Sequence, residues 1–250
     1  MITHKVVIIT GSSRGIGANT AKLFAENGYA VCINYKSNKD SAEKIRDEIL
    51  NIGSKCIVVK ADVSISNEVT HLFNTVEREL GSVSVLVNNA AILKQQSRME
   101  GIDEDRFREV LRVNVIACFL CCKEAVKRMS TNNGGAGGTI VNVSSTAALS
   151  GAPNEYIDYA VSKGALDTLT KGLALEVADE GIRVNAVRPA FIHTDIHASA
   201  GEATRIERLK SKIPLQRGGS SKEVAEAIFW LASEKSSFVT GSFIDTSGGL

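Results

Sequence analysis

The chain has 250 residues, of which 44% are hydrophobic and 23% are charged, a balance typical of a globular domain with a sizeable core and not of a disordered chain. Its 29 basic and 28 acidic side chains leave a formal charge of +1, which gives no electrostatic footprint for nucleic acid or an anionic membrane. The apolar run from Val6 to Ile9 is too short to span a bilayer and lacks the layout of a signal peptide, and nothing downstream approaches a spanning length. We therefore expect a single cytoplasmic domain over residues 1–250, with small-molecule partners, no nucleic acid and no membrane.

Short apolar runs rich in β-branched residues alternate with helix-length segments along the chain. In the first half, the sequence predicts strands at 5–10, 30–35 and 55–62, and helices up to about residue 27, near 38–52 and near 66–80. The pattern repeats in the second half, with strands at 84–90, 138–145 and 182–190 and helices near 103–130 and 155–180. Continuous apolar strands separated by helices indicate a parallel sheet covered on both faces. We therefore predict an α/β fold, a Rossmann-type doubly wound parallel sheet of about seven strands, whose ligands bind outside the carboxyl ends of the strands.

The first predicted strand runs directly into the turn TGSSRGIG at residues 10–17, where a helix begins. Gly11 permits a tight turn, Gly15 allows the backbone to approach a ligand closely, and Gly17 lets the helix pack on the strand. A glycine turn alone is a weak signal, but the strand, turn and helix context supports a phosphate-binding site. We expect the cofactor to contact this turn, including Ser13, Arg14 and Ile16.

The end of the second predicted strand bears on the choice between NAD and NADP. A carboxylate there would bind the ribose 2′-hydroxyl and repel a 2′-phosphate. The sequence instead continues Asn34, Tyr35, Lys36 and Ser37, and its first acid comes at Asp40. Lys36 is either a solvated surface cation or a ligand of a 2′-phosphate, and the missing acid favours NADP(H). Tyr35, Lys36 and Ser37 are therefore predicted cofactor contacts.

Five cysteines form an odd and irregularly spaced set, which argues against a disulfide framework: Cys32, Cys56, Cys118, Cys121 and Cys122. Cys118 and Cys121 do make a C-x-x-C, but within the apolar helical run VIACFLCC. Buried small side chains on a core helix are favoured over a redox or zinc site. The glycine-rich stretch at 132–138 is interpreted as a flexible surface turn before the fifth strand.

The stretch NEYIDYAVSKGA at residues 154–165 holds two tyrosines and a lysine in a predicted helix. Tyr159 and Lys163 are one turn apart on one face, whereas Tyr156 is two turns from Lys163. A nearby ammonium favours the phenolate, so we expect Lys163 to lower the pKa of Tyr159 and to bring proton exchange toward neutral pH. The alternative is that Tyr159 belongs to the hydrophobic core and that Lys163 buries its aliphatic stem and extends its ammonium group to solvent. Tyr156 is expected at the helix start, near the cleft mouth, in reach of substrate.

Residues 191–215 interrupt the alternation of strands and helices. They are predicted to form a loop and a short amphipathic helix over the strand ends, which suits a substrate lid. His193 and His197 lie four residues apart, but the sequence offers no evident third ligand, so no metal site is predicted. Either histidine could contact substrate instead.

Four motifs occur in a fixed order: G-x-x-x-G-x-G in the first turn, NNAA at 88–91, YAVSK at 159–163 and RPAFIHT at 188–194. With them the chain resembles the short-chain dehydrogenase/reductase family over essentially its whole length. It looks similar to bacterial members described as glucose dehydrogenase-like or 3-oxoacyl-carrier-protein reductase-like. Ala91 and Ala190 stand where the family usually has glycine, and their methyl groups would narrow the nicotinamide side of the pocket unless the local backbone accommodates them.

The resemblance implies catalytic roles for four residues. Tyr159 would be the general acid or base at the substrate carbonyl, and Lys163 would also bind the nicotinamide ribose. A serine after the fifth strand would hydrogen-bond the same carbonyl oxygen: Ser145 by motif match, with Ser144 as the alternative because adjacent strand residues face opposite ways. Asn114 in LRVNV would hold a water through its backbone carbonyl.

The resemblance also implies the remaining cofactor contacts. In members that use NADP, the residue that matches Arg14 points to the 2′-phosphate, so Arg14 is either such a ligand or a solvated surface cation. Asp62 would contact the adenine, Asn88 and Ala90 would lie along the ribose, and the others would be Val63, Pro189, Ile192 and Thr194. An Asp or Asn at such places could equally cap a turn. The expected protein is an NADP(H)-dependent oxidoreductase that interconverts a carbonyl and a secondary alcohol, and the resemblance implies a homotetramer, as is common in the family. The alternative is a non-catalytic NADP(H)-binding sensor or scaffold.

Overall fold

A single seven-stranded parallel sheet forms the centre of the protein in the computed structural model, which describes residues 4–250 apart from the side chain of His197. Its strands run in the order β3-β2-β1-β4-β5-β6-β9. The strands are β1 (Val6–Ile9), β2 (Ala30–Tyr35), β3 (Cys56–Lys60), β4 (Val83–Asn88), β5 (Gly138–Val143), β6 (Ile182–Pro189) and β9 (Phe243–Thr246). The strand order reverses between β1 and β4, which is the switch point where doubly wound folds bind ligands. The predicted Rossmann-type fold is confirmed.

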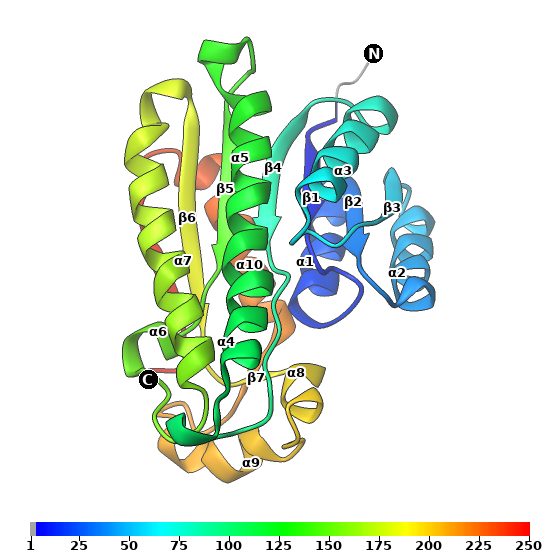
Figure 1. Cartoon of the computed structure of the whole chain (residues 1–250). Helices are drawn as coiled ribbons and strands as arrows, with labels where there is room; N and C mark the ends of the chain where they lie inside the picture. The colour runs from blue at the N-terminus through cyan, green and yellow to red at the C-terminus, as the bar shows by residue number, and fades with distance from the viewer. Residues whose placement is uncertain (1–3) are drawn as a thin grey trace.

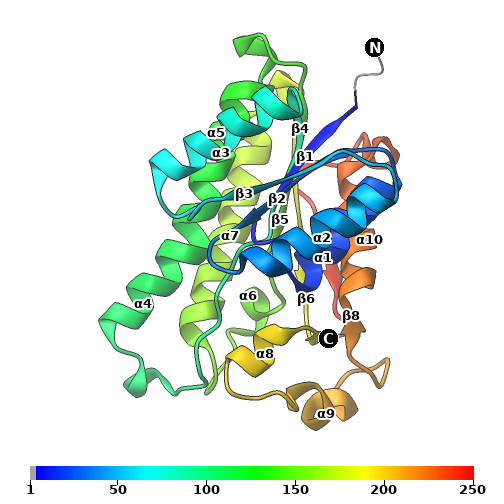
Figure 2. The same cartoon turned by 90° about the vertical axis from the view of Figure 1, so that its right-hand side faces the viewer.

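Helices cover both faces of the sheet (Figures 1 and 2). One face carries α3 (Ser66–Glu79), α5 (Ala117–Met129) and α7 (Ile157–Glu176). The other carries α1 (Gly15–Glu26), α2 (Lys39–Asn51) and α10 (Ser221–Ala232). Each face has its own cluster of buried apolar side chains, and because the strands are buried on both sides they read as continuous apolar runs.

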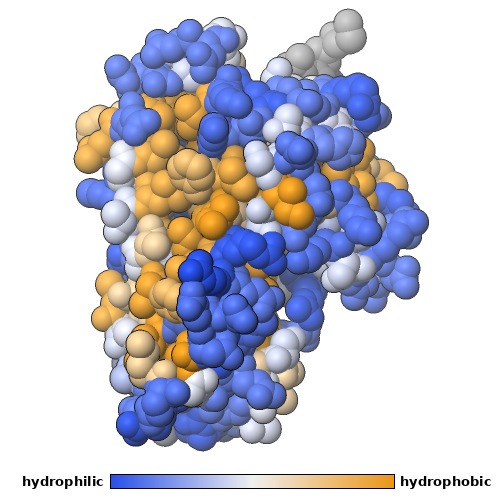
Figure 3. All heavy atoms as spheres, viewed as in Figure 1, coloured by the Kyte–Doolittle hydropathy of each residue, from blue (hydrophilic) through white to orange (hydrophobic). Residues whose placement is uncertain are grey.

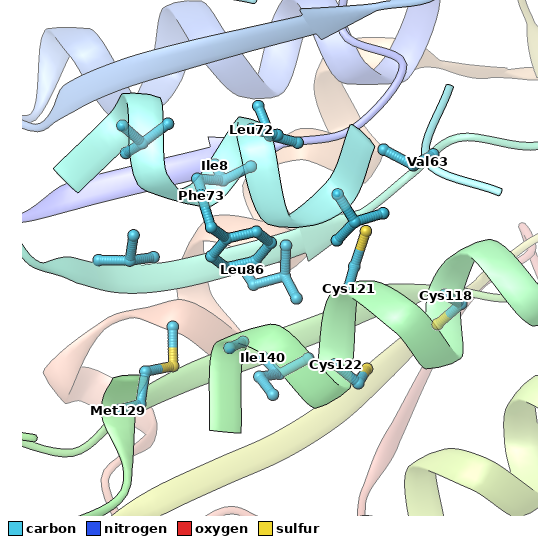
Figure 4. Close-up of a cluster of buried hydrophobic side chains, with 14 of the residues drawn as sticks. Ile8, Val63, Leu72, Phe73, Leu86, Cys118, Cys121, Cys122, Met129 and Ile140 are labelled. Atoms are coloured by element: carbon cyan, nitrogen blue, oxygen red, sulfur yellow. The ribbon is translucent and has the colours of Figure 1, made fainter. Parts of the chain in front are cut away.

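The cysteines of α5 belong to the core, as predicted. Cys118, Cys121 and Cys122 pack with Phe73 and Leu86 between the helices and the sheet (Figure 4). All five cysteines are free thiols. Burial raises the pKa of Cys121 well above its ordinary value, so this thiol stays protonated and unreactive.

The long helix predicted near 103–130 contains a change of winding in its middle. The segments α4 (Glu104–Leu111) and α5 are joined by a π-helical turn over Arg112–Ile116. Such turns are rare and often mark functional sites. Asn114 lies at the centre of this turn and is buried.

The stretch 132–138 is a surface turn before β5, as predicted. A Cβ at Gly135 would stand 2.4 Å from the carbonyl oxygens of Arg128 and Met129. The backbone N–H of Gly137 also donates to the Met129 carbonyl at 2.7 Å. The glycines here allow a close approach between chain segments, which composition alone could not distinguish from mobility.

The segment between β6 and α10 lies across the carboxyl edge of the sheet (Figure 2). It contains the short helices α8 (Asp195–Ser199) and α9 (Arg205–Leu209) and the paired strands β7 (Ile192–His193) and β8 (Gly219–Ser220). A further short helix, α6 (Ala147–Ser150), follows β5. In the part of the chain that the structure describes, no helix is long and apolar enough to cross a membrane.

Candidate active site

A cavity of about 670 Å³ opens at the carboxyl edge of the sheet, between the strand ends and the segment that carries α8 and α9. Most of the predicted site residues line it. They are Gly11, Ser13, Arg14, Gly15, Ile16, Tyr35, Lys36, Ser37, Asp62, Val63, Ala90, Ser145, Tyr159, Lys163, Pro189, Ile192 and Thr194. The cavity therefore runs from the glycine turn to the amino end of α7.

The glycine turn presents a helix end suited to a phosphate. Arg14 is the N-cap of α1, its side chain makes no capping bond, and the first turn holds no acid. The first backbone N–H groups of such a helix attract an anion. Asn34 fixes the turn, since its Oδ1 accepts from the Gly11 N–H at 3.2 Å and its Nδ2 donates to the Ala61 carbonyl at 3.1 Å. The sequence interpretation did not assign this anchoring role to Asn34.

Two of the predicted cofactor contacts bind each other. Lys36 Nζ lies 2.7 Å from Asp62 Oδ2. Although burial works against ionisation, hydrogen bonds from Lys36 and Ser64 lower the pKa of Asp62 to about 2. Asp62 is therefore a carboxylate at any physiological pH, and it holds Lys36 just after the end of β2.

Gly17 and Asn88 do not line the cavity and act indirectly. A Cβ at Gly17 would stand 2.6 Å from Asn89 Nδ2, so this glycine lets α1 pack against the chain after β4. Asn88 turns toward α5, where its Nδ2 donates to Asn142 Oδ1 at 2.9 Å. The next residue, Asn89, lines the cavity instead and donates to the Gly11 carbonyl at 3.0 Å. Asn89 and Ala90 of the predicted segment thus line the cavity, whereas the side chain of Asn88 faces the other way, because alternate residues of a strand face opposite ways.

Asn114 also lies outside the cavity lining, but it ties together the chain that surrounds the cavity. Its Oδ1 accepts from the Ile92 N–H at 2.8 Å, and its Nδ2 donates to the Ile92 carbonyl at 3.1 Å and to Ser162 Oγ at 3.0 Å. A buried amide so occupied fixes the π turn against α7 and against the segment after β4.

The two serines after β5 have different partners. Ser144 is buried, and its Oγ donates to Asp167 Oδ1 at 2.6 Å. Ser145 Oγ donates to the Pro189 carbonyl at 3.2 Å, and its proximity to the Tyr159 hydroxyl works to lower the pKa of that tyrosine. This geometry favours Ser145 over Ser144 as the serine that faces a substrate.

Tyr159 and Lys163 lie on one face of α7, as their spacing predicted, with Lys163 Nζ 5.4 Å from the centroid of the Tyr159 ring. The expected lowering of the tyrosine pKa is wrong for this structure. Burial raises the pKa of Tyr159 to about 12, and the nearby Ser145 hydroxyl opposes the rise only in part. Burial also lowers the pKa of Lys163 to about 8, and its Nζ donates to the Val143 carbonyl at 2.8 Å. Helical spacing gives proximity, but it does not reveal how strongly both groups are desolvated.

The amino end of α7 is anchored by a pair that sequence reasoning missed. Asp158, almost fully buried, receives a hydrogen bond from Arg106 Nε of α4 at 2.7 Å. The sequence did place Asp158 near the start of a predicted helix, where an acidic side chain is favourable, and this could have indicated a structural role. This pair fixes the depth at which the next residue, Tyr159, enters the cavity.

The other end of the cavity is lined by Glu155 and Arg205, which no motif indicated, and by Phe191 of the RPAFIHT motif. Tyr156 is there as predicted, as the N-cap of α7. Ala91 and Ala190 also line the cavity, and neither has the positive φ that would strain an alanine.

His193 is exposed on β7 and is not among the cavity-lining residues. The side chain of His197 lies outside the described residues. Within the described part of the chain, no group of three or more His, Cys, Asp or Glu side chains could hold a metal ion.

The chain matches known proteins over its whole length. The family model described as "Enoyl-(Acyl carrier protein) reductase" matches residues 11–250. The chain is 53% identical to an "uncharacterized oxidoreductase" of Escherichia coli, over 98% of this chain and 99% of that protein. It is 34% identical to glucose 1-dehydrogenase 2 of Bacillus subtilis, over 100% and 95% of the two chains.

Two solved structures share the fold closely. A short-chain type dehydrogenase/reductase from Mycobacterium marinum superposes with a TM-score of 0.92 at 33% identity, covering 99% of this chain and 95% of that one. The 3-ketoacyl-(acyl-carrier-protein) reductase of Brucella melitensis, complexed with NADH, superposes with a TM-score of 0.91 at 31% identity, covering 100% and 99%. Together with the motifs and their geometry, these matches show that the chain belongs to the short-chain dehydrogenase/reductase family of nicotinamide-dependent oxidoreductases.

Proposed function

We propose that the protein is an NADP(H)-dependent oxidoreductase that interconverts a carbonyl and a secondary alcohol. One observation carries the proposal: Ser145, Tyr159 and Lys163 meet in a cavity whose other end is the glycine turn and the uncapped amino end of α1. The turn would hold the pyrophosphate of a dinucleotide, and the three side chains would surround the reacting carbonyl.

Each of the three side chains has a task in this reaction. The bound nicotinamide supplies the hydride to the carbonyl carbon, or accepts it in the reverse direction. The hydroxyl of Tyr159 donates its proton to the carbonyl oxygen as negative charge develops there, and Ser145 Oγ donates a hydrogen bond to the same oxygen. Because the pKa of Tyr159 is raised to about 12, its hydroxyl is fully protonated at neutral pH and ready to act as the acid. Lys163, on the same face of α7, stabilises the phenolate that forms.

Two cations support the preference for NADP(H). Both line the cavity: Arg14 at the start of α1, and Lys36 just after β2, where the chain carries no acid until Asp40. A 2′-phosphate would compete with Asp62 for Lys36 and would find Arg14 exposed beside it. We expect Arg14→Ala to reduce the preference for NADPH over NADH by about tenfold in kcat/KM. Lys39→Ala, which removes an exposed lysine outside the cavity lining, is the matched control. Equal use of both cofactors by the unaltered protein would refute the preference.

The main test is NADPH oxidation with a panel of ketones, aldehydes and acyl thioesters. We expect turnover of at least one class, and a fall of about 100-fold or more in kcat for Tyr159→Phe, because the variant loses the proton donor but keeps the ring. NADPH binding, followed by its fluorescence, should persist in that variant. Tyr29→Phe, which alters a buried tyrosine of the core on the opposite face of the sheet, should keep full activity. If NADPH binds but no carbonyl is reduced, the protein is a sensor or scaffold instead.

We also propose that the protein is a homotetramer. Exposed apolar side chains gather on the outer faces of α5 and α7: Ile116 just before α5, Phe119, Val161 and Leu175. Figure 3 shows the apolar surface over these two helices. Phe238 and Leu250, near the carboxyl terminus, are also exposed. Two separate self-complementary surfaces are what a tetramer with dihedral symmetry requires.

The five free thiols support the expected cytoplasmic location.

A further inference from the structure

One carboxylate behind the cavity connects two of the residues that the proposed reaction uses. Asp167 lies on α7 one turn after Lys163, so the two side chains are neighbours on one face of the helix. Asp167 does not line the cavity, and its side chain is 14% exposed. Its contacts therefore belong to the wall behind Lys163 and not to the space that a ligand fills.

The first oxygen of Asp167 fixes the end of β5. Ser144 Oγ donates to Asp167 Oδ1 at 2.6 Å and lies 3.3 Å from the Lys163 carbonyl oxygen. Ser144 stands between two groups of the candidate site. The carbonyl of the residue before it, Val143, accepts the hydrogen bond from Lys163 Nζ at 2.8 Å, and the residue after it is Ser145. A contact that fixes Ser144 thus fixes both the acceptor of the lysine and the serine proposed to face the substrate.

The second oxygen of Asp167 fixes the end of β6. Arg188 Nε donates to Asp167 Oδ2 at 2.8 Å. The guanidinium carbon of Arg188 also lies 3.9 Å from the centroid of the Phe243 ring, so the arginine is stacked on the edge strand β9. The carbonyl of the next residue, Pro189, accepts a hydrogen bond from Ser145 Oγ at 3.2 Å. Asp167 therefore ties together the ends of β5 and β6, between which Ser145 is placed.

The charge of Asp167 acts on Lys163 as well. Burial lowers the pKa of Lys163 to about 8, and the negative charge of Asp167 is among the influences that oppose this change. The other titratable groups that face the ammonium, among the described residues, are Tyr159 of α7 and Cys118 of α5. Asp167 is the carboxylate of this set, and a buried ammonium needs such a partner to remain charged.

Arg188 moderates the effect of Asp167. Its guanidinium binds Asp167 at 2.8 Å and lies 3.6 Å from Asp245 of β9. Two changes of charge should therefore act on Lys163 in opposite directions. Loss of the carboxylate favours the neutral amine, whereas loss of the guanidinium favours the ammonium. A residue that served packing alone would not produce effects of opposite sign.

We propose that Asp167 is a positioning residue of the reaction, which sets the place of Ser145 through the ends of β5 and β6 and helps to keep Lys163 charged. Asp167 acts through these residues and lies outside the cavity. The proposal rests on the proposed function, because that function assigns Ser145 and Lys163 their tasks.

The first test uses the carbonyl compound that the unaltered protein reduces fastest, with NADPH at saturation. Asp167→Asn keeps the shape of the side chain and removes its charge. We expect kcat to fall by about tenfold while KM for the carbonyl compound changes by less than about twofold, because the substrate keeps its contacts and only the alignment of Ser145 and Lys163 is lost. Asp167→Glu restores the carboxylate and should regain part of kcat.

The pH profile of kcat separates charge from packing. Activity falls at high pH as Lys163 loses its proton, so a lower pKa of this lysine moves the alkaline limb to lower pH. We expect Asp167→Asn to move this limb down by about half a pH unit or more, Asp167→Glu to leave it close to its place, and Arg188→Gln to move it up. Asp245→Asn, which removes a carboxylate that is 42% exposed and lies 3.6 Å from Arg188, is the control and should change neither kcat nor the limb.

Two outcomes would overturn the proposal. One is an alkaline limb that stays in place in Asp167→Asn, and the other is a limb that moves in the same direction in Asp167→Asn and Arg188→Gln. Either result would leave Asp167 as a residue of packing. Urea unfolding is measured for each variant, and if Asp167→Asn does not fold, the direction of the shift in Arg188→Gln decides.

A measurement without turnover keeps this result distinct from the fate of the proposed function. With lysine labelled by carbon-13 at Cε, the NMR signal that is missing in Lys163→Met reports the titration of Lys163. This titration should shift to lower pH in Asp167→Asn and to higher pH in Arg188→Gln. If these shifts are found but no carbonyl compound is reduced, the oxidoreductase proposal fails and the control of Lys163 by Asp167 stands. If carbonyl compounds are reduced and the titration does not shift, the reverse holds.

Discussion

At the scale of single residues, the unusual group is Lys163, a lysine that is 2% exposed and makes one hydrogen bond, to the Val143 carbonyl. Burial lowers its pKa from 10.5 to about 8, a difference that corresponds to about 3 kcal/mol against the ammonium. The bond to Val143 returns about 1 kcal/mol. We therefore predict that Lys163→Met makes the protein about 2 kcal/mol more stable at pH 7 in urea unfolding, while it removes activity.

The pH dependence of that difference follows from the sign of the shift. Between pH 8 and 10.5 the unfolded chain keeps the lysine proton that the folded chain has lost, so the stability of the unaltered protein should rise with pH across this window. The variant lacks this rise, and the gap between the two proteins should shrink from pH 7 to pH 10. Lys171→Met is the control, because this exposed lysine of α7 also donates to a backbone carbonyl, that of Gly241. A gap that is absent at pH 7, or constant with pH, would contradict the prediction.

The residues of the candidate site could be predicted where a motif fixes their spacing. They could not be predicted where their role depends on burial or on contacts with residues that are distant in the sequence. The pairing of Tyr159 with Lys163 follows from one helical turn, but the direction of the tyrosine pKa shift depends on burial that the sequence does not display. The distinction between Ser144 and Ser145 depends on Asp167, which is 23 residues from Ser144 along the chain. Arg205 reaches the cavity from the short helix in the predicted lid, and no motif in that segment could have selected it.

At the scale of elements, two glycines in the turn from β1 to α1 have different tasks. Gly17 allows the turn to pack and so supports stability, whereas Gly15 leaves room for a ligand. A Cβ at Gly17 would stand 2.6 Å from Asn89 Nδ2 and 2.8 Å from Ser12 Cα, so the backbone itself is in the way. We predict that Gly17→Ala lowers the free energy of unfolding by about 2 kcal/mol. At Gly15 the nearest atom would be Thr194 Cγ2, at an ordinary 3.5 Å, and the φ of +57° should cost only about 1 kcal/mol.

Gly15→Ala should therefore fold, but its methyl group would lie in the cavity where a phosphate approaches the helix end. We expect its affinity for NADPH to fall by about tenfold or more in a fluorescence titration, with urea unfolding as the parallel measurement. A Gly17→Ala protein as stable as the unaltered one, or a Gly15→Ala protein that binds NADPH equally well, would show that the turn is looser than its contacts indicate.

The elements themselves were largely predictable because their causes are local. Strands buried on both faces must be apolar throughout, and each predicted strand of the parallel sheet is found within a few residues of its place. The start of α7 was predicted two residues early, since the strained turn at Ala152 and Asn154 delays it. The π turn around Asn114 was not predicted, because its stabilising partners, Ile92 and Ser162, come from other parts of the chain.

At the scale of the whole molecule, the alternation of strands and helices predicts the sheet. It does not predict which molecules contact the outer surfaces of the helices that cover the sheet. The helices α5 and α7 pack their inner sides on the sheet and leave an apolar outer surface (Figure 3). A surface of this kind is stable in water when another copy of the chain covers it.

Phe119 lies on that surface and is 50% exposed. We predict that the unaltered protein has a mass four times that of its 26.7 kDa chain by size-exclusion chromatography with light scattering, and that Phe119→Glu forms a smaller species. A carboxylate at this place would be buried against apolar side chains of the neighbouring copy without a partner, which opposes association. Leu50→Glu alters a leucine of similar exposure, 47%, on α2 at the opposite face of the sheet, and should leave the mass unchanged. A monomeric unaltered protein, or dissociation by Leu50→Glu as readily as by Phe119→Glu, would place the interface elsewhere or remove it.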